Sequence, residues 1–173
     1  MDAISYVRDQ LKQAHEFLEG TVADVTADEA HWLPQGNANP LGATYAHLVL
    51  GEDGFVNGML RGTAPLFATT WAGRTGASEV PPEGPAWDQW GRQVRIDLPV
   101  LREYAQVVYA ASDQWLASLS VEDMNRTIDL SPAGLGQQSL GWVLGAGVVG
   151  HVQAHWGEIC CLKGLQGGRG YPV

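Results

Sequence analysis

Basic residues are scarce in this sequence: ten lysines and arginines stand against nineteen aspartates and glutamates, which gives a formal net charge of −9. The ten basic residues are scattered along the chain and form no stripe or cluster. Nucleic acids and anionic lipid surfaces are both bound mainly by clustered Lys and Arg side chains. We therefore expect neither a nucleic acid nor a membrane as a partner.

Cysteine is also rare, and the two that are present, Cys160 and Cys161, are adjacent. Neighbouring cysteines pair only with strain, so we expect no disulfide framework and interpret both as small apolar packing groups. The longest apolar stretch, residues 140–150, is too short to cross a bilayer. The first residues show no basic segment followed by an apolar run, as a signal peptide would. We interpret the protein as cytoplasmic.

The chain has 173 residues, which suits one domain, and we predict a single domain over residues 1–173. Apolar residues recur at helical spacing in four segments, near residues 4–20, 41–60, 93–119 and 139–165. The sequence contains no internal repeat and no convincing alternation of apolar and polar residues. The pattern predicts an all-α fold, a four-helix bundle.

Local signals predict where several helices begin and how deeply they lie. Thr26 and Glu29 have the spacing of a capping box, which predicts a short helical turn. Pro40 is well placed to begin the second long helix. The last helix is apolar nearly all round up to Gly150, so we predict that it is the most buried one. Its glycines would let another helix approach closely, within the bundle or across a dimer.

Residues 63–90 are rich in glycine, proline, serine and threonine and show no helical period. A connection this long inside a domain is uncommon and often functional. It carries aromatic side chains that must pack on something: Phe67, Trp71, Trp87 and Trp90. Two interpretations stay open, a strap that covers the bundle and a lid over a pocket. Residues 126–138 are also irregular, apart from a brief extended piece predicted at residues 127–130.

Histidines on the apolar helices are the candidate metal ligands. His151 and His155 are four residues apart, so on a helix they lie about 40° apart on one face, one turn along the axis. Two imidazoles placed in this way can bind a single ion. His47 lies in an apolar run of the second helix, and a bundle can bring it opposite the pair. We predict a metal site of these three residues, with hydrogen-bonded core histidines as the alternative. The other two histidines, His15 and His31, lie among polar residues, and we expect them to be solvated.

Two glutamates accompany the histidines. Glu158 follows His155 by three residues and shares its face of the helix. Its interpretations stay open: a fourth ligand, an acceptor that fixes the tautomer of a ring, a catalytic general base, or a solvated side chain. Glu52 lies five residues after His47, about 140° round the helix. We therefore expect Glu52 to pair with another helix and not to join the same ion.

The last helix resembles the signature of the DinB/YfiT-like superfamily over residues 151–159, where two histidines spaced by three residues precede a glycine, a polar residue and an aliphatic one. Residues 39–52 are similar to the second-helix pattern of that family, a histidine with a carboxylate five residues on, and residues 26–32 also fit. The resemblance implies an up-down-down-up four-helix bundle, a three-histidine metal site and frequent homodimers. It implies no DNA polymerase activity, and some members use a low-molecular-weight thiol in transferases or isomerases.

Three neutral imidazoles leave one or more positions open on an ion, which is typical of catalytic rather than structural sites. A divalent ion such as Zn, Ni or Fe suits imidazole ligands, and it can lower the pKa of bound water to about 7 or bind a thiol. On family analogy, the leading hypothesis is a low-molecular-weight-thiol-dependent transferase that acts on a small molecule, with Glu158 as the candidate catalytic residue. A metal-dependent hydrolase comes next. The alternative from another class is a non-enzymatic dimeric protein that binds a metal or a ligand.

Overall fold

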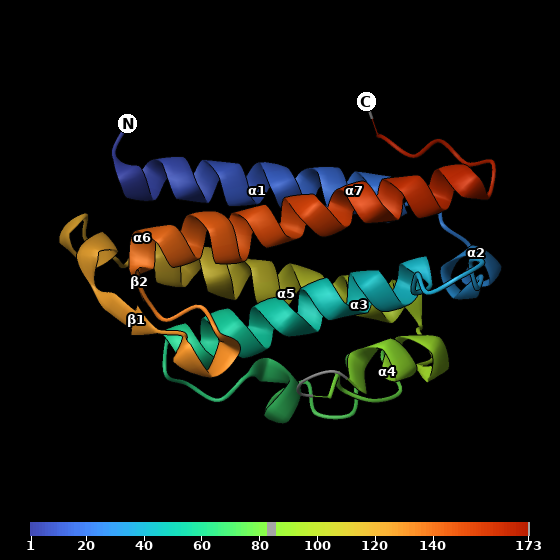
Figure 1. Ribbon diagram of the computed structural model, residues 1–173, viewed down its shortest axis with the longest axis horizontal. Helices are drawn as coiled ribbons and strands as arrows, with labels where there is room; N and C mark the ends of the chain where they lie inside the picture. The colour runs from blue at the N-terminus through green and yellow to red at the C-terminus, as the bar shows by residue number, and fades with distance from the viewer. Residues whose placement is uncertain (83–85, 173) are drawn as a thin grey trace.

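The computed structural model of the chain describes residues 1–82 and 86–172. Residues 83–85, which belong to the predicted connection 63–90, and residue 173 lie outside the described residues. Within the described ranges the fold is mostly helical, with a small two-stranded sheet at one end (Figure 1). The prediction was an all-α fold, and a mostly helical fold is confirmed. The two-stranded sheet is a feature that the apolar pattern did not predict.

The long helices lie side by side (Figure 1). They are α1 (Ala3–Val22), α3 (Leu41–Glu52), α5 (Leu98–Ala117) and α7 (Gly150–Leu165). Helix α1 packs on α5 and α7, and α3 packs on the same two helices, so the apolar stripes of these helices meet in one core. Two π-helical segments extend the set: η1 (Asp53–Leu60) continues α3, and η6 (Val143–Val149), preceded by α6 (Leu140–Trp142), leads into α7.

Shorter elements occupy the connections: α2 (Ala27–His31), η2 (Leu66–Ala68), α4 (Trp87–Gln93), η4 (Glu122–Asn125) and η5 (Ser131–Ala133). The strands β1 (Thr127–Asp129) and β2 (Gln137–Ser139) pair in antiparallel fashion, with Thr127 opposite Ser139. Strand β1 covers the extended piece predicted at residues 127–130. Strand β2 lies mostly in residues that were predicted to be irregular. The sequence does not reveal it, because a strand of three residues is too short to show an alternating pattern.

The predicted starts of the second long helix and of the short turn before it are confirmed. In the capping box, Glu29 N donates to Thr26 Oγ1 at 3.3 Å, and Thr26 N donates back to Glu29 Oε2 at 2.8 Å. Helix α3 begins directly after Pro40. The capping box is a reliable signal because it satisfies backbone groups that a helix end leaves without partners. Pro40 makes no capping hydrogen bond and suits a helix start because its ring fixes φ, here at −57°.

The predicted start of the third long helix at Gln93 is wrong. Gln93 ends α4, and the chain enters α5 only at Leu98. The side chain of Asp97 caps this start by accepting a hydrogen bond from the backbone of the first turn, which also contains Pro99. An aspartate followed by a proline two residues later was the signal for this helix start, and the apolar spacing on either side hid it.

The prediction that the last helix is the most buried one is also wrong. In α3 every residue of the range 41–50 is buried except His47, whereas Trp142 and residues 145–147 of the last helical stretch are exposed. Glycine and alanine make a sequence look apolar, but they carry little side-chain area and so contribute little to the drive for burial. Within the part of the chain that the structure describes, no helix is both long and apolar enough to span a membrane.

The connection between η1 and α5 packs over the bundle like a strap. The ring of Trp71 lies 5.4 Å from that of Tyr104 on α5, and Trp90 is buried. The buried carboxylate of Asp53 fixes this strap, because its Oδ2 accepts hydrogen bonds from Phe67 N at 2.9 Å and from the Tyr104 hydroxyl at 2.5 Å. Burial and the bond to Asp53 raise the pKa of Tyr104 far above its ordinary value, so the phenol stays a donor. A closing motion of this segment stays a prediction.

Loss of the Tyr104 hydroxyl should destabilise the fold. Tyr104→Phe leaves the buried Asp53 carboxylate with one donor fewer, and we expect the free energy of unfolding to fall by about 1.5–3 kcal/mol, the range for a hydrogen bond to a charged group. Urea unfolding followed by circular dichroism measures this change. The matched control is Tyr6→Phe at an exposed position, for which we expect a change within about 0.5 kcal/mol. Equal stabilities of the two variants would contradict the assigned role of Asp53.

Candidate metal centre

Histidines from two helices meet at one point of the bundle. His47 projects from α3, and His151 and His155 project from successive turns of α7, the helix that packs against α3. His47 Nε2 lies 3.2 Å from His151 Nε2, and one nitrogen from each of the three rings falls within 4.8 Å of the others. The structure therefore brings the three predicted ligands together.

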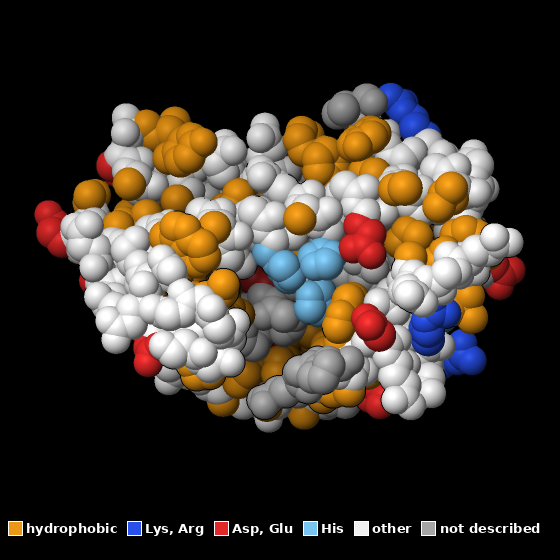
Figure 2. Space-filling view, viewed as in Figure 1, with side chains coloured by type: hydrophobic (Ala, Val, Ile, Leu, Met, Phe, Trp, Pro, Cys, Tyr) orange, Lys and Arg blue, Asp and Glu red, His pale blue; other side chains and the backbone are white. Residues whose placement is uncertain are grey.

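The three rings face one another edge-on. Ring centroids are 5.1 Å apart for His47 and His151, 5.1 Å for His47 and His155, and 4.7 Å for His151 and His155, with interplanar angles above 70° in each case. The rings are partly buried, and the Trp87 ring packs on His47 with its centroid 4.4 Å away. Figure 2 shows histidine side chains gathered in a hollow near the middle of this face. The cluster is therefore reachable from outside, with an aromatic ring packed against His47.

Burial keeps two of these rings neutral. It lowers the pKa of His47 from 6.5 to about 4, and the neighbouring rings of His151 and His155 lower it further in the same direction. The pKa of His151 is likewise lowered to about 4, first by burial and then by His155. Neutral imidazole is the form that binds metals. At neutral pH these nitrogens therefore meet little competition from protons.

Glu158 lies beside the cluster and contacts His155. Its Oε2 is 2.7 Å from His155 Nδ1, and a carboxylate only accepts, so the Nδ1–H of His155 donates. This bond leaves Nε2 of His155 free to face the other rings. Metal-binding histidines commonly donate their second nitrogen to a carboxylate in this way, which fixes the tautomer and the ring orientation.

The donor set fits a divalent ion. Two nitrogens bound to zinc at roughly 2.0–2.1 Å with tetrahedral angles lie about 3.3 Å apart. The 3.2 Å separation of His47 Nε2 and His151 Nε2 is close to that value. Imidazole nitrogens suit Zn, Ni and Fe, and the carboxylate on His155 supplies the outer contact that such sites use.

Cavities border the cluster on two sides among the described residues. One, of about 610 Å³, lies under the strap and is lined by His47, Phe67 and Trp87, among others. The other, of about 200 Å³, lies between the α3–η1 and η6–α7 segments and reaches His151. Neither lining contains Lys or Arg. The surroundings therefore favour neutral or cationic small molecules over anions.

The expectation that His15 and His31 are solvated is wrong. His15 is only 7% exposed, and its Nε2 lies 2.7 Å from Glu52 Oε2. His31 donates from Nδ1 to Ala27 O at 2.7 Å and accepts the Ile96 N–H on Nε2 at 3.0 Å. The signal for His15 was its place between Leu11 and Leu18 on the apolar face of the first helix, which polar neighbours in the sequence concealed.

The contact with His15 also bears out what the sequence suggests for Glu52. Glu52 on α3 pairs with α1 and stays out of the nitrogen cluster.

Cys160 is buried as expected, whereas Cys161 is exposed, and both are free thiols. The expectation that both cysteines are packing groups therefore holds for Cys160 and fails for Cys161.

A protein-family model described as the DinB superfamily matches residues 10–159. The chain belongs to the DinB superfamily. The match spans both helices of the histidine cluster, so the cluster lies within the part that this DinB chain shares with its family. No curated protein matches the chain.

A solved structure shares the fold of this chain. The crystal structure described as that of the conserved protein of locus from Enterococcus faecalis aligns with a TM-score of 0.77. It covers 94% of this chain and 96% of its own, at 19% sequence identity. At this identity the likeness shows a shared fold and nothing about activity.

The stability of the metal-free protein should depend on pH through His47 and His151. Their folded-state pKa of about 4 lies below the ordinary value of 6.5, so between these values the unfolded chain binds protons that the folded chain does not. Stability is then full above about pH 7 and falls as the pH drops, by at most about 2 kcal/mol per histidine between pH 7.5 and pH 5.

Urea unfolding of chelator-treated protein at pH 7.5 and pH 5 measures this fall. The double variant His47→Gln/His151→Gln should lose clearly less stability over the same interval than the unsubstituted chain. His31→Gln, outside the cluster, should behave like the unsubstituted chain. An equal fall for the double variant would show that the two rings are not held neutral by the fold.

Proposed function

We propose that the protein binds one divalent metal ion through His47, His151 and His155 and uses it on a small-molecule substrate. The observation that carries this proposal is the 3.2 Å separation of the facing Nε2 atoms of His47 and His151, with His155 completing the set within 4.8 Å. Membership of the DinB superfamily supports it. Three protein ligands leave a position open, as in catalytic zinc sites.

The leading form of this proposal is a low-molecular-weight-thiol-dependent transferase, and a metal-dependent hydrolase is the second form. When bound, such an ion supplies a Lewis acid that lowers the pKa of a thiol or of a water molecule. The chain supplies the surroundings: Trp87 covers His47, and apolar walls around both cavities limit the entry of water. The preference for thiol transfer rests on family analogy.

For Glu158 we propose a positioning role. Its Oε2 is engaged by His155 Nδ1 at 2.7 Å, and the side chain lines neither cavity next to the cluster. Both observations favour an acceptor that orients His155 over a base that touches a substrate. Removal of such an outer carboxylate typically weakens metal binding by about 10- to 100-fold.

We also propose the finer architecture and setting that the family resemblance implies. In Figure 1 α1 and α7 run in one direction and α3 and α5 in the other, which supports an up-down-down-up order. A homodimer is supported by a run of exposed, uncharged small residues on the last helical stretch, Gly145, Ala146 and Gly147. The free thiols of Cys160 and Cys161 suit a reducing, cytoplasmic setting.

One contact favours the alternative of a non-enzymatic dimeric metal- or ligand-binding protein. The Trp87 ring lies against His47, and an aromatic side chain over a metal ligand blocks access. The cavity of about 610 Å³ under the strap argues the other way, because it reaches His47 beside Trp87. We therefore place the enzyme ahead of the binding protein.

Metal content tests the centre. Elemental analysis of tag-free protein should find about one divalent ion per chain, and none in the triple variant His47→Ala/His151→Ala/His155→Ala, because three imidazoles carry the binding. His31→Gln, which changes a histidine outside the cluster, should keep the ion. Equal metal content in the unsubstituted chain and the triple variant, with circular dichroism showing both folded, would end the proposal.

Further readouts on the same samples test the accompanying proposals. Glu158→Ala should keep the ion but release it to a chelator about tenfold more readily.

Light scattering should give a mass twice that of the 18.6 kDa chain. A monomer mass at micromolar concentration would contradict the homodimer without touching the metal centre.

A thiol probe distinguishes the two enzyme forms. The cobalt-loaded protein should develop a near-ultraviolet thiolate-to-cobalt absorption band when 2-mercaptoethanol is added, because an open position accepts a thiolate. The triple histidine variant controls for cobalt held by Cys160 and Cys161. If the protein holds cobalt but develops no band, the thiol-dependent transferase is excluded and the hydrolase is favoured.

A further inference from the structure

A buried histidine–glutamate pair lies next to the metal centre but outside it. His15 on α1 and Glu52, the last residue of α3, are 7% and 6% exposed. His15 Nε2 lies 2.7 Å from Glu52 Oε2, and since the carboxylate accepts, the Nε2–H of His15 donates. The Tyr109 ring stacks on His15 with centroids 3.6 Å apart, which holds the imidazole in this orientation.

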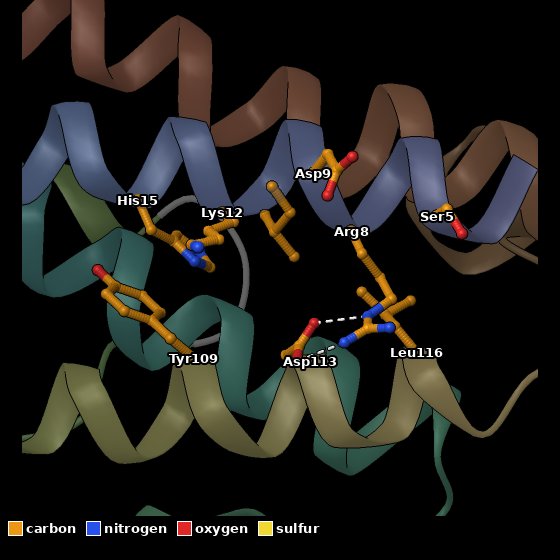
Figure 3. Close-up of a pocket in the computed structure, with 9 residues that line it drawn as sticks. Ser5, Arg8, Asp9, Lys12, His15, Tyr109, Asp113 and Leu116 are labelled. Atoms are coloured by element: carbon orange, nitrogen blue, oxygen red, sulfur yellow. Dashed lines mark hydrogen bonds and ion pairs between the residues drawn. The ribbon is translucent and has the colours of Figure 1, made fainter. Parts of the chain in front are cut away.

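The pair separates two cavities. On the His15 side, a cavity of about 410 Å³ opens between α1 and α5 (Figure 3). Arg8 and Asp113 in its lining pair with each other, because Arg8 Nε and Nη2 donate to the two carboxylate oxygens of Asp113 at 2.7 and 2.9 Å, and Glu52 is not part of this lining. On the other side, Glu52 lines the 200 Å³ cavity that reaches His151. A ligand of Glu52 would therefore lie in the cavity beside His151.

The second oxygen of Glu52 lacks a partner. Oε1 is buried and accepts no hydrogen bond from the described residues. A buried carboxylate oxygen without a donor costs free energy, and such an atom in a folded protein calls for an ion, a water molecule or a ligand. Glu52 also lines the cavity beside His151. The terminal torsion of a glutamate side chain is soft, so its carboxylate can adjust to an occupant of that cavity.

The cavity beside His151 has one acidic end and apolar walls. Its described lining consists of Glu52 and His151 together with apolar residues and glycines: Leu48, Gly51, Phe55, Val56, Gly147, Val148 and Val152. Neither Lys nor Arg is among the residues that line it. At about 200 Å³ it is smaller than the roughly 300–1,000 Å³ pockets that take drug-sized ligands. The occupant is therefore small, mostly apolar and able to donate a hydrogen bond.

We propose that Glu52 binds the ammonium group of a small, mostly apolar amine that occupies the cavity beside His151. The ammonium group supplies the hydrogen-bond donor that Oε1 lacks, and its positive charge strengthens a hydrogen bond to a carboxylate. His15 is a positioning residue, which holds the other carboxylate oxygen against the α1 side. This inference rests on the proposed function, since it takes the histidine centre as the reactive end of the site and names the class of substrate.

Three probes of equal size test the proposal: n-butylamine, 1-butanol and diethyl ether, each with five non-hydrogen atoms. Backbone amide shifts of Gly51, Gly147 and Val148, which line the cavity, report their binding in chelator-treated and in zinc-loaded protein. The amine should bind about tenfold more tightly than the ether, with the alcohol between them, because a hydrogen bond to a charged group adds affinity that the ether cannot gain.

Two variants locate the source of the preference. Glu52→Gln should reduce the preference for amine over ether to about twofold or less while the affinity for the ether stays the same. Glu16→Gln removes the same charge at an exposed position on α1, and it should keep the tenfold preference. The comparison of probes in the unsubstituted protein does not depend on whether Glu52→Gln folds.

The metal-free measurement separates this inference from the proposed function. A preference that persists after chelation supports Glu52, whatever the zinc content of the protein. A preference that appears only with zinc overturns the inference, because the amine then binds the ion. Equal affinities for amine and ether, or an undiminished preference in folded Glu52→Gln, also overturn it, whereas a failure to bind zinc counts against the metal centre alone.

Discussion

The buried carboxylate of Asp53 is the constraint on which the surroundings of the histidine cluster depend. It follows directly after α3, the helix that carries His47, and it accepts hydrogen bonds from Tyr104 on α5 and from the backbone of Phe67 in the strap. Its Oδ1 accepts a third from the Asn57 side chain within η1. One side chain thus joins the end of a ligand-bearing helix, the helix behind it and the segment that covers the cavity.

The adjacent carboxylates of Glu52 and Asp53 contact two different helices. Adjacent residues on a helix point about 100° apart, so neighbouring carboxylates reach different helices. Glu52 reaches His15 on α1, and Asp53 reaches Tyr104 on α5. Between them they tie α3 to both of these helices through buried polar contacts, while the apolar face of α3 packs on α7. Contacts with α1, α5 and α7 together fix the orientation of α3, and with it the direction in which His47 points.

The histidine positions could be predicted from the sequence because the helices that carry them are visible in the pattern of apolar residues. His151 and His155 must share a face at four residues apart, and His47 is the one position of residues 41–50 that the core does not fully bury. The capping box at Thr26 was predictable for a similar reason, since its geometry involves neighbouring residues only. Whether the cluster binds a metal stays a prediction.

The features that sequence reasoning missed depend on partners far away in the chain. The place of His15 on the apolar face of α1 was visible in the sequence, but its partners Glu52 and Tyr109 come from other helices, and nothing in its local sequence indicates them. The exposure of residues 145–147 depends on what packs there, which a pattern of small residues does not encode. The late start of α5 is a different kind of miss, because the signal at Asp97 was local and apolar spacing outweighed it.

The π-helical turns have a consequence for comparing this chain with its family. Segment η1 follows Glu52 directly, and η6 ends one residue before Gly150 and two before His151. A π turn takes up about one residue more than an α turn while the flanking helix keeps its direction. A relative with an ordinary α-helix there would carry one residue fewer and still present its histidines the same way. Sequence alignments of the family should therefore allow single-residue gaps at 53–60 and 143–149, where a fixed spacing from the histidines would misassign the residues that line the cavity.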